Sequence, residues 1–258
     1  MLELGVLTLN WLQSMLLPLT RVGAFFFAAP LFSQSAGIGR IRVVYAATLC
    51  LLMMPAFPTS LSEPTMPYGE PTLLLILSEA LIGVSMGLVL QFVTAAVVTA
   101  GEQISVSVGI GFAQSFDPSL GPAPVLSQFL NLLALLIFLT AGGHTIMIAM
   151  FTESIRSMPP GEFRLTDIPS LMEFSTIIFK GAALLAAPLL LTLLAVNLGV
   201  GALSRATPSL NVFAVGFAVS LLVGFALLFV LMPVIAERIT ELWQQAGAYI
   251  RPRILGED

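Results

Sequence analysis

The stretch Thr72–Ala100 reads TLLLILSEALIGVSMGLVLQFVTAAVVTA and contains one charged residue, Glu79. A helix needs about 20 largely apolar residues to cross the hydrocarbon core of a bilayer, and this stretch is longer. It lacks the alternation of apolar and polar residues that is typical of membrane β-strands. Because lipid accepts only helices and closed barrels, the stretch predicts a transmembrane α-helix and decides the fold class.

The rest of the chain has the same apolar character. Of its 258 residues, 57% are hydrophobic and 9% are charged, whereas ordinary soluble domains carry about 25% charged residues. We therefore predict an all-α, multi-span integral membrane protein with about six long helices, some of them kinked by internal prolines. The predicted spans are Leu4–Phe32, Ile41–Phe57, Thr72–Ala100, Val125–Phe151, Leu171–Val200 and Leu210–Ala236.

Composition also bounds the number of domains and the classes of ligand. No charged or low-complexity linker divides the chain, so we expect one membrane-embedded domain over residues 1–258, with 237–258 as its C-terminal tail. The net charge of -4 is scattered, which argues against a nucleic-acid partner. Cys50 is the single cysteine, so the sequence offers neither an intrachain disulfide nor a thiolate metal cluster. We expect no metal and no cofactor.

Small residues recur at four-residue spacing in two of the predicted helices. One set comprises Gly83 and Gly87, and the other comprises Gly216, Ser220 and Gly224. Such rows let helix backbones approach closely in lipid, where packing rather than the hydrophobic effect drives association. The first interpretation is packing within the chain, and contact with another subunit is the alternative.

A few ionisable residues fall in or beside the apolar stretches. Arg21, Glu79, Glu102 and Lys180 are the candidates for buried charges, because a charge at membrane depth faces a partner, a cavity or the headgroups. Arg21 and Lys180 are also long enough to snorkel to the interface. For Glu79, exposure at the interface and an ion pair with another subunit both stay open.

The distribution of arginines conflicts with a regular bundle. Arg40 and Arg42 follow the first predicted span, while Arg238, Arg251 and Arg253 follow the last. Strict alternation of six spans puts these two groups on opposite sides, but the positive-inside rule places both in the cytoplasm. We therefore expect either a segment that does not fully cross or an irregular arrangement of helices.

Residues 101–124 form a plug-like loop in this interpretation. From Ile104 to Phe112 large apolar residues alternate with Ser or Gly, as in an extended chain, although Ile104, Val108 and Phe112 would also share a helix face. Irregular backbone at membrane depth persists only when it is buried in protein or lines an aqueous cavity. A re-entrant or pore-facing segment and an amphipathic surface connection both remain possible.

The sequence contains one match to a catalytic motif. Residues 83–87, GVSMG, fit the G-x-S-x-G pattern of a serine nucleophile, and His144 would complete a dyad like that of a rhomboid-like intramembrane serine protease. However, Ser85 lies midway along a continuous apolar helix, whose backbone N–H groups are already used. We therefore expect a protein that is not an enzyme. A small multi-span permease is a further alternative, although the two related halves of many transporters are not evident.

Several pieces of the chain resemble the FliR family, in order and over almost the full length. The most specific lie between Ala100 and Gln128: Ala100–Glu102, Gly109–Ala113, Phe116–Pro118 and Pro124–Leu126. Further similar pieces are Arg21 with Ala29–Phe32, Leu81–Gly83 with Gly87, Gly143–His144, and Leu210–Phe213 with Val215–Phe217. The last of these looks more flagellar than virulence-related.

The resemblance implies a function that the residues alone do not. It implies a non-catalytic core subunit of the flagellar type III protein export gate, which with FliP and FliQ passes unfolded flagellar axial proteins across the bacterial inner membrane. Association with FlhB, a place near FlhA within the basal body, and helices arranged as hairpins are also implied. The loop would be a pore plug, with Phe112 and Phe116 as hydrophobic stoppers. The implied plug residues are Gly109, Ile110, Gly111, Phe112, Ala113, Phe116, Asp117 and Pro118.

Overall fold

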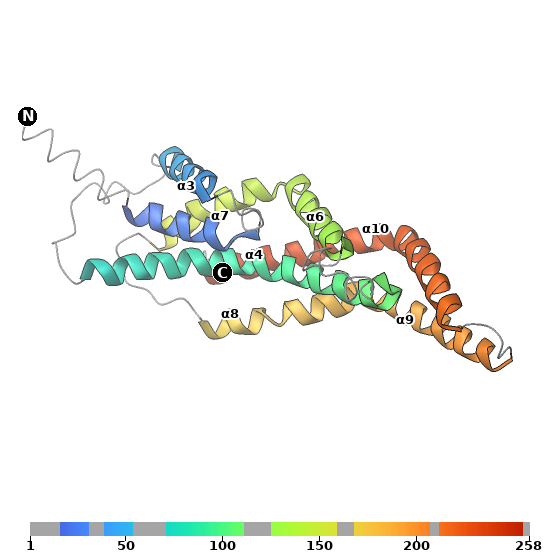
Figure 1. The fold of residues 1–258 in the computed structure, drawn as a ribbon. Coiled ribbons are helices and arrows are strands. Elements are labelled where there is room, and N and C mark those ends of the chain that lie inside the picture. Colours follow the sequence, from blue (N-terminus) through green and yellow to red (C-terminus); the bar gives the residue numbers. More distant parts are fainter. Residues whose placement is uncertain are drawn as a thin grey trace, which may run out of the picture. The chain divides into compact units, whose positions relative to one another are not determined.

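The computed structural model describes residues 16–30, 39–53, 71–110, 125–158, 168–206 and 212–254. All regular secondary structure in these ranges is α-helical (Figure 1), which confirms the predicted fold class for them. The first helix within the described ranges is Leu16–Ala28. The labelled helices are α3 (Gly39–Met53), α4 (Pro71–Val108), α6 (Val125–Thr140), α7 (Gly143–Ser157), α8 (Ile168–Phe174), α9 (Ile177–Ala206) and α10 (Val212–Ile254).

Three helical stretches within the described ranges are long and apolar enough to cross a membrane, namely Leu73–Val108, Ile168–Leu203 and Val215–Ile250. A fourth candidate is the pair α6 and α7, which is long and apolar enough only when the two helices are taken together. The pair is bent at the break between the helices. The prediction of a multi-span membrane protein is thus confirmed. The expected number of about six spans is not reached in the described ranges.

Local sequence explains why fewer spans form. The predicted span Val125–Phe151 is interrupted because Gly142 adopts a left-handed conformation with φ of 78°, a backbone region that glycine enters without steric cost. The carbonyl oxygen of Gly142 then accepts bonds from the N–H groups of Thr145 and Ile146, which start α7. Helix α3 has 15 residues, or about 22 Å at 1.5 Å per residue, so it is short for a bilayer core. Residues 4–15, 31–32 and 54–57 of the first two predicted spans lie outside the described residues.

Two helices are longer than predicted. Residues 101–108, expected as the start of the plug-like loop, are the last two turns of α4, because Ala100, Ile104 and Val108 share one buried helix face. Residues 237–254 of the expected C-terminal tail continue α10. There Ile239, Leu242, Ala246 and Ile250 are buried at the three- and four-residue spacing of a helix stripe.

The chain divides into two compact units. The first contains residues 1–91, 142–175 and 245–258, and the second contains 92–141 and 176–244. The first unit therefore holds the helix Leu16–Ala28, α3, α7, α8 and parts of α4 and α10, and the second holds α6, α9 and the other parts. The expectation of one domain over 1–258 stays a prediction.

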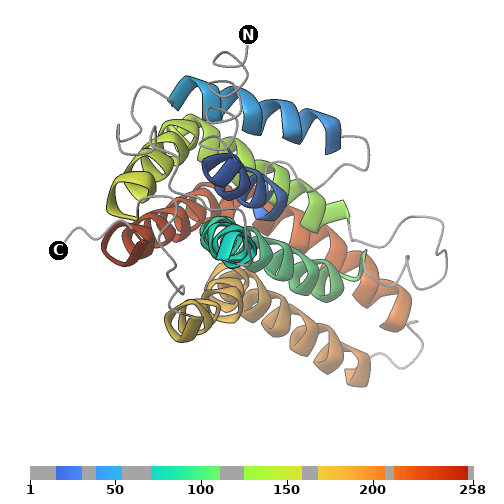
Figure 2. The same cartoon turned by 90° about the vertical axis from the view of Figure 1, so that its left-hand side faces the viewer.

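Aromatic side chains form the core of the first unit. Figure 2 shows the helix Leu16–Ala28, in dark blue, beside α4 and α7. The rings of Phe25 and Phe151 pack edge to face with centroids 4.7 Å apart, a favoured aromatic geometry. Elsewhere in the unit, Phe174 stacks on Tyr249 with centroids 4.4 Å apart, and the Tyr249 hydroxyl lies 2.8 Å from Ser170 Oγ.

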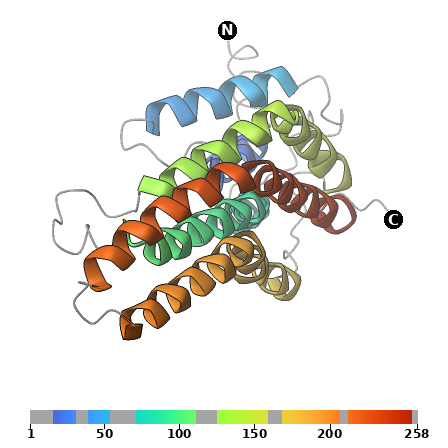
Figure 3. The same ribbon diagram turned by 90° about the vertical axis from the view of Figure 1, so that its right-hand side faces the viewer.

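In the second unit, α6 and α9 pack with parts of α4 and α10 (Figure 3). The indole of Trp243 lies against the ring of Phe138 with centroids 4.5 Å apart, and its N–H donates to the carbonyl of Ala134 over 3.1 Å. Internal prolines are present in both long helices of this unit, Pro188 in α9 and Pro233 in α10. Figure 1 shows α10 bent along its length, as an internal proline predicts.

Candidate functional site: a buried ion pair and the end of α4

The guanidinium of Arg21 is the centre of a hydrogen-bond network in the first unit. Its Nε donates to Glu79 Oε2 over 2.6 Å and its Nη2 donates to Glu79 Oε1 over 3.1 Å. Nη1 donates to the carbonyl oxygen of Ser154 over 2.7 Å and to its Oγ over 3.0 Å. Nη2 donates a second time, to the carbonyl oxygen of Met158 over 2.9 Å. These bonds occupy all the donors that a guanidinium has.

The ion pair of the network is buried, with side-chain exposure of 0% for Arg21 and 1% for Glu79. A buried charge is tolerated when it is paired and hydrogen-bonded, and both conditions hold here. Breaking such a pair by removing one partner costs about 3–5 kcal/mol, because the other charge is left uncompensated. Arg21 and Glu79, two of the four candidate buried charges, are therefore buried and paired with each other inside one chain.

The network joins three helices that are distant in sequence. Arg21 belongs to the helix Leu16–Ala28, Glu79 lies on α4, and both carbonyl acceptors lie at the C-terminal end of α7. The carbonyl oxygen of Ser154 also accepts the N–H of Met158, the residue that follows α7, and a cation at a helix C-terminus is favoured by the helix dipole. Arg21 thus caps α7 while it pairs with α4. Sequence reasoning did not find Ser154 or Met158, since the acceptors are mostly backbone atoms.

Gly83 and Gly87 determine how closely α4 approaches the helix Leu16–Ala28. A Cβ atom on Gly83 would overlap the carbonyl oxygen of Arg21. One on Gly87 would lie 2.6 Å from the Ala28 Cβ and 2.9 Å from the carbonyl oxygen of Phe25. With Glu79 these glycines follow one another at four-residue spacing, so they lie on one helix face. The two glycines pack within the chain and bring Glu79 into range of Arg21.

The small residues of α10 make unequal contacts in the second unit. A Cβ on Gly224 would lie 2.6 Å from Cγ2 of Val108, so this glycine admits the end of α4. Ser220 is buried and donates its hydroxyl to Asn197 Oδ1 over 2.7 Å. At Gly216 the nearest atom, Val200 Cγ1, would be 3.4 Å away, which leaves room for a methyl group.

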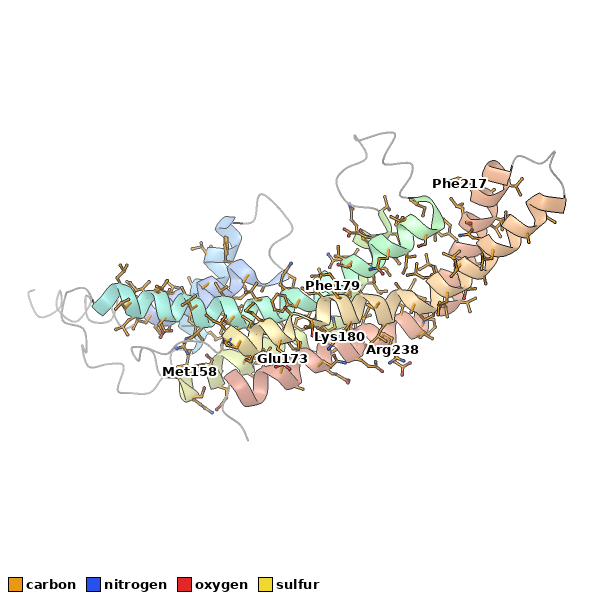
Figure 4. The ribbon with its side chains drawn as sticks, turned by 90° about the horizontal axis from the view of Figure 1, so that it is seen from below. Met158, Glu173, Phe179, Lys180, Phe217 and Arg238 are labelled. Carbon is orange, nitrogen blue, oxygen red and sulfur yellow. The ribbon has the colours of Figure 1, made fainter. Side chains whose placement is uncertain are left out.

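Helix α4 ends at a glycine that lies against an aromatic ring. Gly109 has φ of 98° and its N–H donates to the carbonyl of Val106 over 3.1 Å. A Cβ there would lie 2.9 Å from two ring atoms of Phe217, a residue labelled near the start of α10 in Figure 4. Ile110 is half-buried. The other proposed plug residues, Gly111, Phe112, Ala113, Phe116, Asp117 and Pro118, lie outside the described residues.

Comparison with known proteins decides the family. Residues 12–246 match the family model described as "Bacterial export proteins, family 1". The flagellar biosynthetic protein FliR of Escherichia coli (strain K12) is 35% identical over 231 residues, which cover 88% of this chain and 87% of the relative. The chain belongs to the FliR family. The FliR of Pectobacterium carotovorum subsp. carotovorum is 34% identical over 88% of this chain and 87% of its own length, and the FliR of Bacillus subtilis (strain 168) is 30% identical over 85% and 86%.

Family membership confirms the resemblance drawn from the sequence. The matched residues 12–246 include the Arg21 network and the end of α4. The FliR family is one of bacterial export proteins and is not a known enzyme family. This chain is accordingly a membrane component of an export apparatus.

The other two candidate buried charges are exposed in this FliR-family chain. Glu102 lies on α4 between the buried residues Gly101 and Ile104, on the opposite side of the helix from the packed face. Lys180 lies on α9 (Figure 4) and is exposed next to Phe179, which is 74% exposed. Both side chains are exposed within this single chain, so the expectation that they are buried stays a prediction, and apolar flanking sequence does not say which helix face a charge occupies.

The Ser85 hydroxyl has a structural role. Ser85 is 6% exposed and its Oγ donates to the carbonyl of Leu81 over 2.7 Å, one turn back along α4. His144 is exposed at the second residue of α7. A serine nucleophile has to be activated by a base within hydrogen-bond reach, whereas this hydroxyl donates to its own helix. The motif GVSMG therefore forms part of a helix face that packs closely against a neighbouring helix. It does not form the strand-to-helix turn that presents a serine nucleophile.

Replacing Ser85 with alanine should therefore change little. Loss of one hydroxyl bond to a backbone carbonyl costs about 1 kcal/mol or less, so the amount of full-length chain in membranes should stay within about two-fold of the unmodified protein. A fluorophosphonate probe should label neither form. Labelling of the unmodified chain that disappears in Ser85→Ala would instead identify a serine hydrolase.

Proposed function

We propose that this chain is a non-catalytic core subunit of the flagellar type III protein export gate. In the proposal it forms with FliP and FliQ the channel that passes unfolded flagellar axial proteins across the bacterial inner membrane. It associates with FlhB and lies near FlhA within the basal body. The observation that carries the proposal is the match to the FliR family over residues 12–246, which includes helices of both units.

The surface of the long helices supports a role inside a larger membrane assembly. In the most apolar 18-residue part of each candidate span, only a share of the residues is buried inside this chain. The share is 50% for Leu73–Val108, 22% for Ile168–Leu203 and 22% for Val215–Ile250. Large side chains on α9 and α10 are correspondingly exposed, for example Leu191 at 66% and Phe229 at 84%. Lipid or other subunits have to cover this apolar surface, because extended exposed apolar patches mark interfaces.

The plug is a second part of the proposal. Gly109 to Pro118 would line the pore, and Phe112 and Phe116 would exclude water and ions at rest, as hydrophobic constrictions do in channels. Contacts on both sides of this segment support the assignment. At its N-terminal end, Val108 packs against Gly224 and Gly109 against Phe217. Beyond its C-terminal end, Ser127 of α6 packs against α4, where a Cβ on Gly101 would lie 2.5 Å from Cα of Ser127. A plug connected to fixed helix ends could close a pore reproducibly.

Purification of the tagged chain from membranes tests the proposal. The chain is expressed in a flagellated host, extracted in mild detergent, captured by its tag and analysed by mass spectrometry and size-exclusion chromatography. We expect FliP and FliQ to co-elute with it in a constant ratio. An unrelated tagged multi-span protein, treated in the same way, controls for carry-over. A chain that elutes alone as a monodisperse species would contradict the gate and favour the permease.

A further inference from the structure

We propose that Arg21 and Glu79 form a register lock that is complete within this chain. The lock selects one lengthwise alignment of the helix Leu16–Ala28, α4 and α7. The Arg21 guanidinium also binds the carbonyl groups at the C-terminal end of α7. All acceptors of the Arg21 guanidinium belong to this chain. The first unit can therefore reach its native alignment before any partner subunit is added.

Apolar packing alone would select this alignment poorly. Lipid tails are as apolar as the helix faces, so helices in a membrane gain little hydrophobic energy from a particular pairing. Apolar side chains are buried along both helices, namely Val22, Phe25 and Phe26 on one and Ile82 and Met86 on α4. A slip of α4 by one turn, about 5.4 Å, would exchange one set of apolar contacts for another. The same slip would separate the two charges in a buried site, which is strongly unfavourable.

The geometry requires arginine rather than any cation. One planar guanidinium donates to α4 through Nε and Nη2 and to α7 through Nη1 and Nη2. A lysine ammonium has three donors on a single nitrogen, so it cannot make the five hydrogen bonds that Arg21 donates from three separate nitrogens. The lock thus predicts that Arg21→Lys fails although the charge is kept.

Gly83 makes the lock selective for position. It lies one turn after Glu79, and a Cβ there would overlap the Arg21 carbonyl oxygen. At the native register a glycine therefore faces the Arg21 backbone while the carboxylate faces its side chain. A shift of one turn either way would put Glu79 or Gly87 opposite that backbone, and only the native register places both groups correctly.

A cross-linking experiment on the full chain in its native membrane tests the lock. Phe26 and Phe151, whose ring centroids are 6.2 Å apart, are replaced by cysteine in a Cys50→Ala background, so that Phe25 remains in place. A short bis-methanethiosulfonate reagent joins the two thiols, and the joined fraction is read on a gel. The test variants are Arg21→Lys and the apolar pair R21M/E79M. The control is Gly23→Ala, because no atom of the other described residues lies within 4 Å of the position that a Cβ on Gly23 would take, its own helix backbone aside.

We expect Gly23→Ala to cross-link as the parent does, and both test variants to cross-link at least about five-fold less per molecule of full-length chain. A buried ion pair can often be replaced by apolar residues without loss of stability, so a drop in R21M/E79M would report lost alignment. If that pair does not accumulate, Glu79→Gln replaces it, with the same expected direction. Parent-like cross-linking in Arg21→Lys or in R21M/E79M would overturn the lock. The cross-linked fraction does not depend on FliP or FliQ, so a result that overturns the lock would leave the gate proposal standing.

Discussion

Replacing Gly83 with valine is expected to lower the amount of full-length chain in membranes at least ten-fold. The new Cβ would overlap the carbonyl oxygen of Arg21, which is backbone and cannot turn aside as a flexible side chain can. Overpacking costs about 1–3 kcal/mol, and moving α4 away would also break the Arg21–Glu79 pair one turn earlier, at about 3–5 kcal/mol. The sum is comparable with the total stability of many domains, about 5–15 kcal/mol. An immunoblot of the membrane fraction measures the effect.

Gly23→Val provides the matched control. Gly23 lies on the helix that packs against Gly83, but in the described part of the chain nothing outside its own helix backbone lies within 4 Å of the position that its Cβ would take. The same substitution there should leave accumulation within about two-fold of the parent. Equal losses at both positions would show that valine is harmful in any of these helices, and that close approach at Gly83 is not the reason.

A second large effect is expected at Gly109. Gly109→Val should reduce secretion of flagellar axial proteins at least ten-fold while the chain still accumulates to within about two-fold of the parent. Valine is strained at φ of 98°, with a cost of about 1–3 kcal/mol, and its side chain would meet the ring of Phe217. The strain falls at the last turn of α4, so the backbone after Val108 would be redirected without unpacking the helix. Immunoblots of culture supernatant and membranes give the two quantities.

A double-mutant cycle separates the two causes. Gly109→Ala is measured with Phe217 present and in a Phe217→Ala background, because a cycle isolates the coupling between two neighbouring residues. We expect partial recovery of secretion in the double variant, since removing the ring relieves the contact but not the backbone strain. Full recovery would assign the whole effect to the ring, and unchanged secretion in Gly109→Ala alone would contradict the prediction.

Sequence reasoning found both members of the ion pair but not the pair itself. Arg21 and Glu79 could be selected because charges are rare in apolar runs, yet they are 58 residues apart in the chain. Nothing in a one-dimensional pattern indicates which helices become neighbours. The remaining acceptors, the carbonyl groups of Ser154 and Met158, have no sequence signal because every residue carries a carbonyl.

The helical character of the chain was predictable, whereas the helix ends were not. The pattern from Ile104 to Phe112 suits both a strand and a helix, and contacts far away in sequence, such as Val108 with Gly224, accompany the helical outcome. Gly142 shows the opposite problem: a glycine inside an apolar run can be tolerated or can break the helix, and here its left-handed backbone divides α6 from α7. The number of spans depends on such single residues.

The close approach of Gly101 to the backbone of Ser127 has a consequence for the length of chain that connects α4 to α6. It holds the last turns of α4 against the first turn of α6, so the distance that the connecting residues span is set by the helices themselves. Lengthening such a loop is inexpensive, with each doubling adding about 0.6 kcal/mol of closure entropy. The packing of α4 against α6 therefore does not fix how many residues connect the two helices.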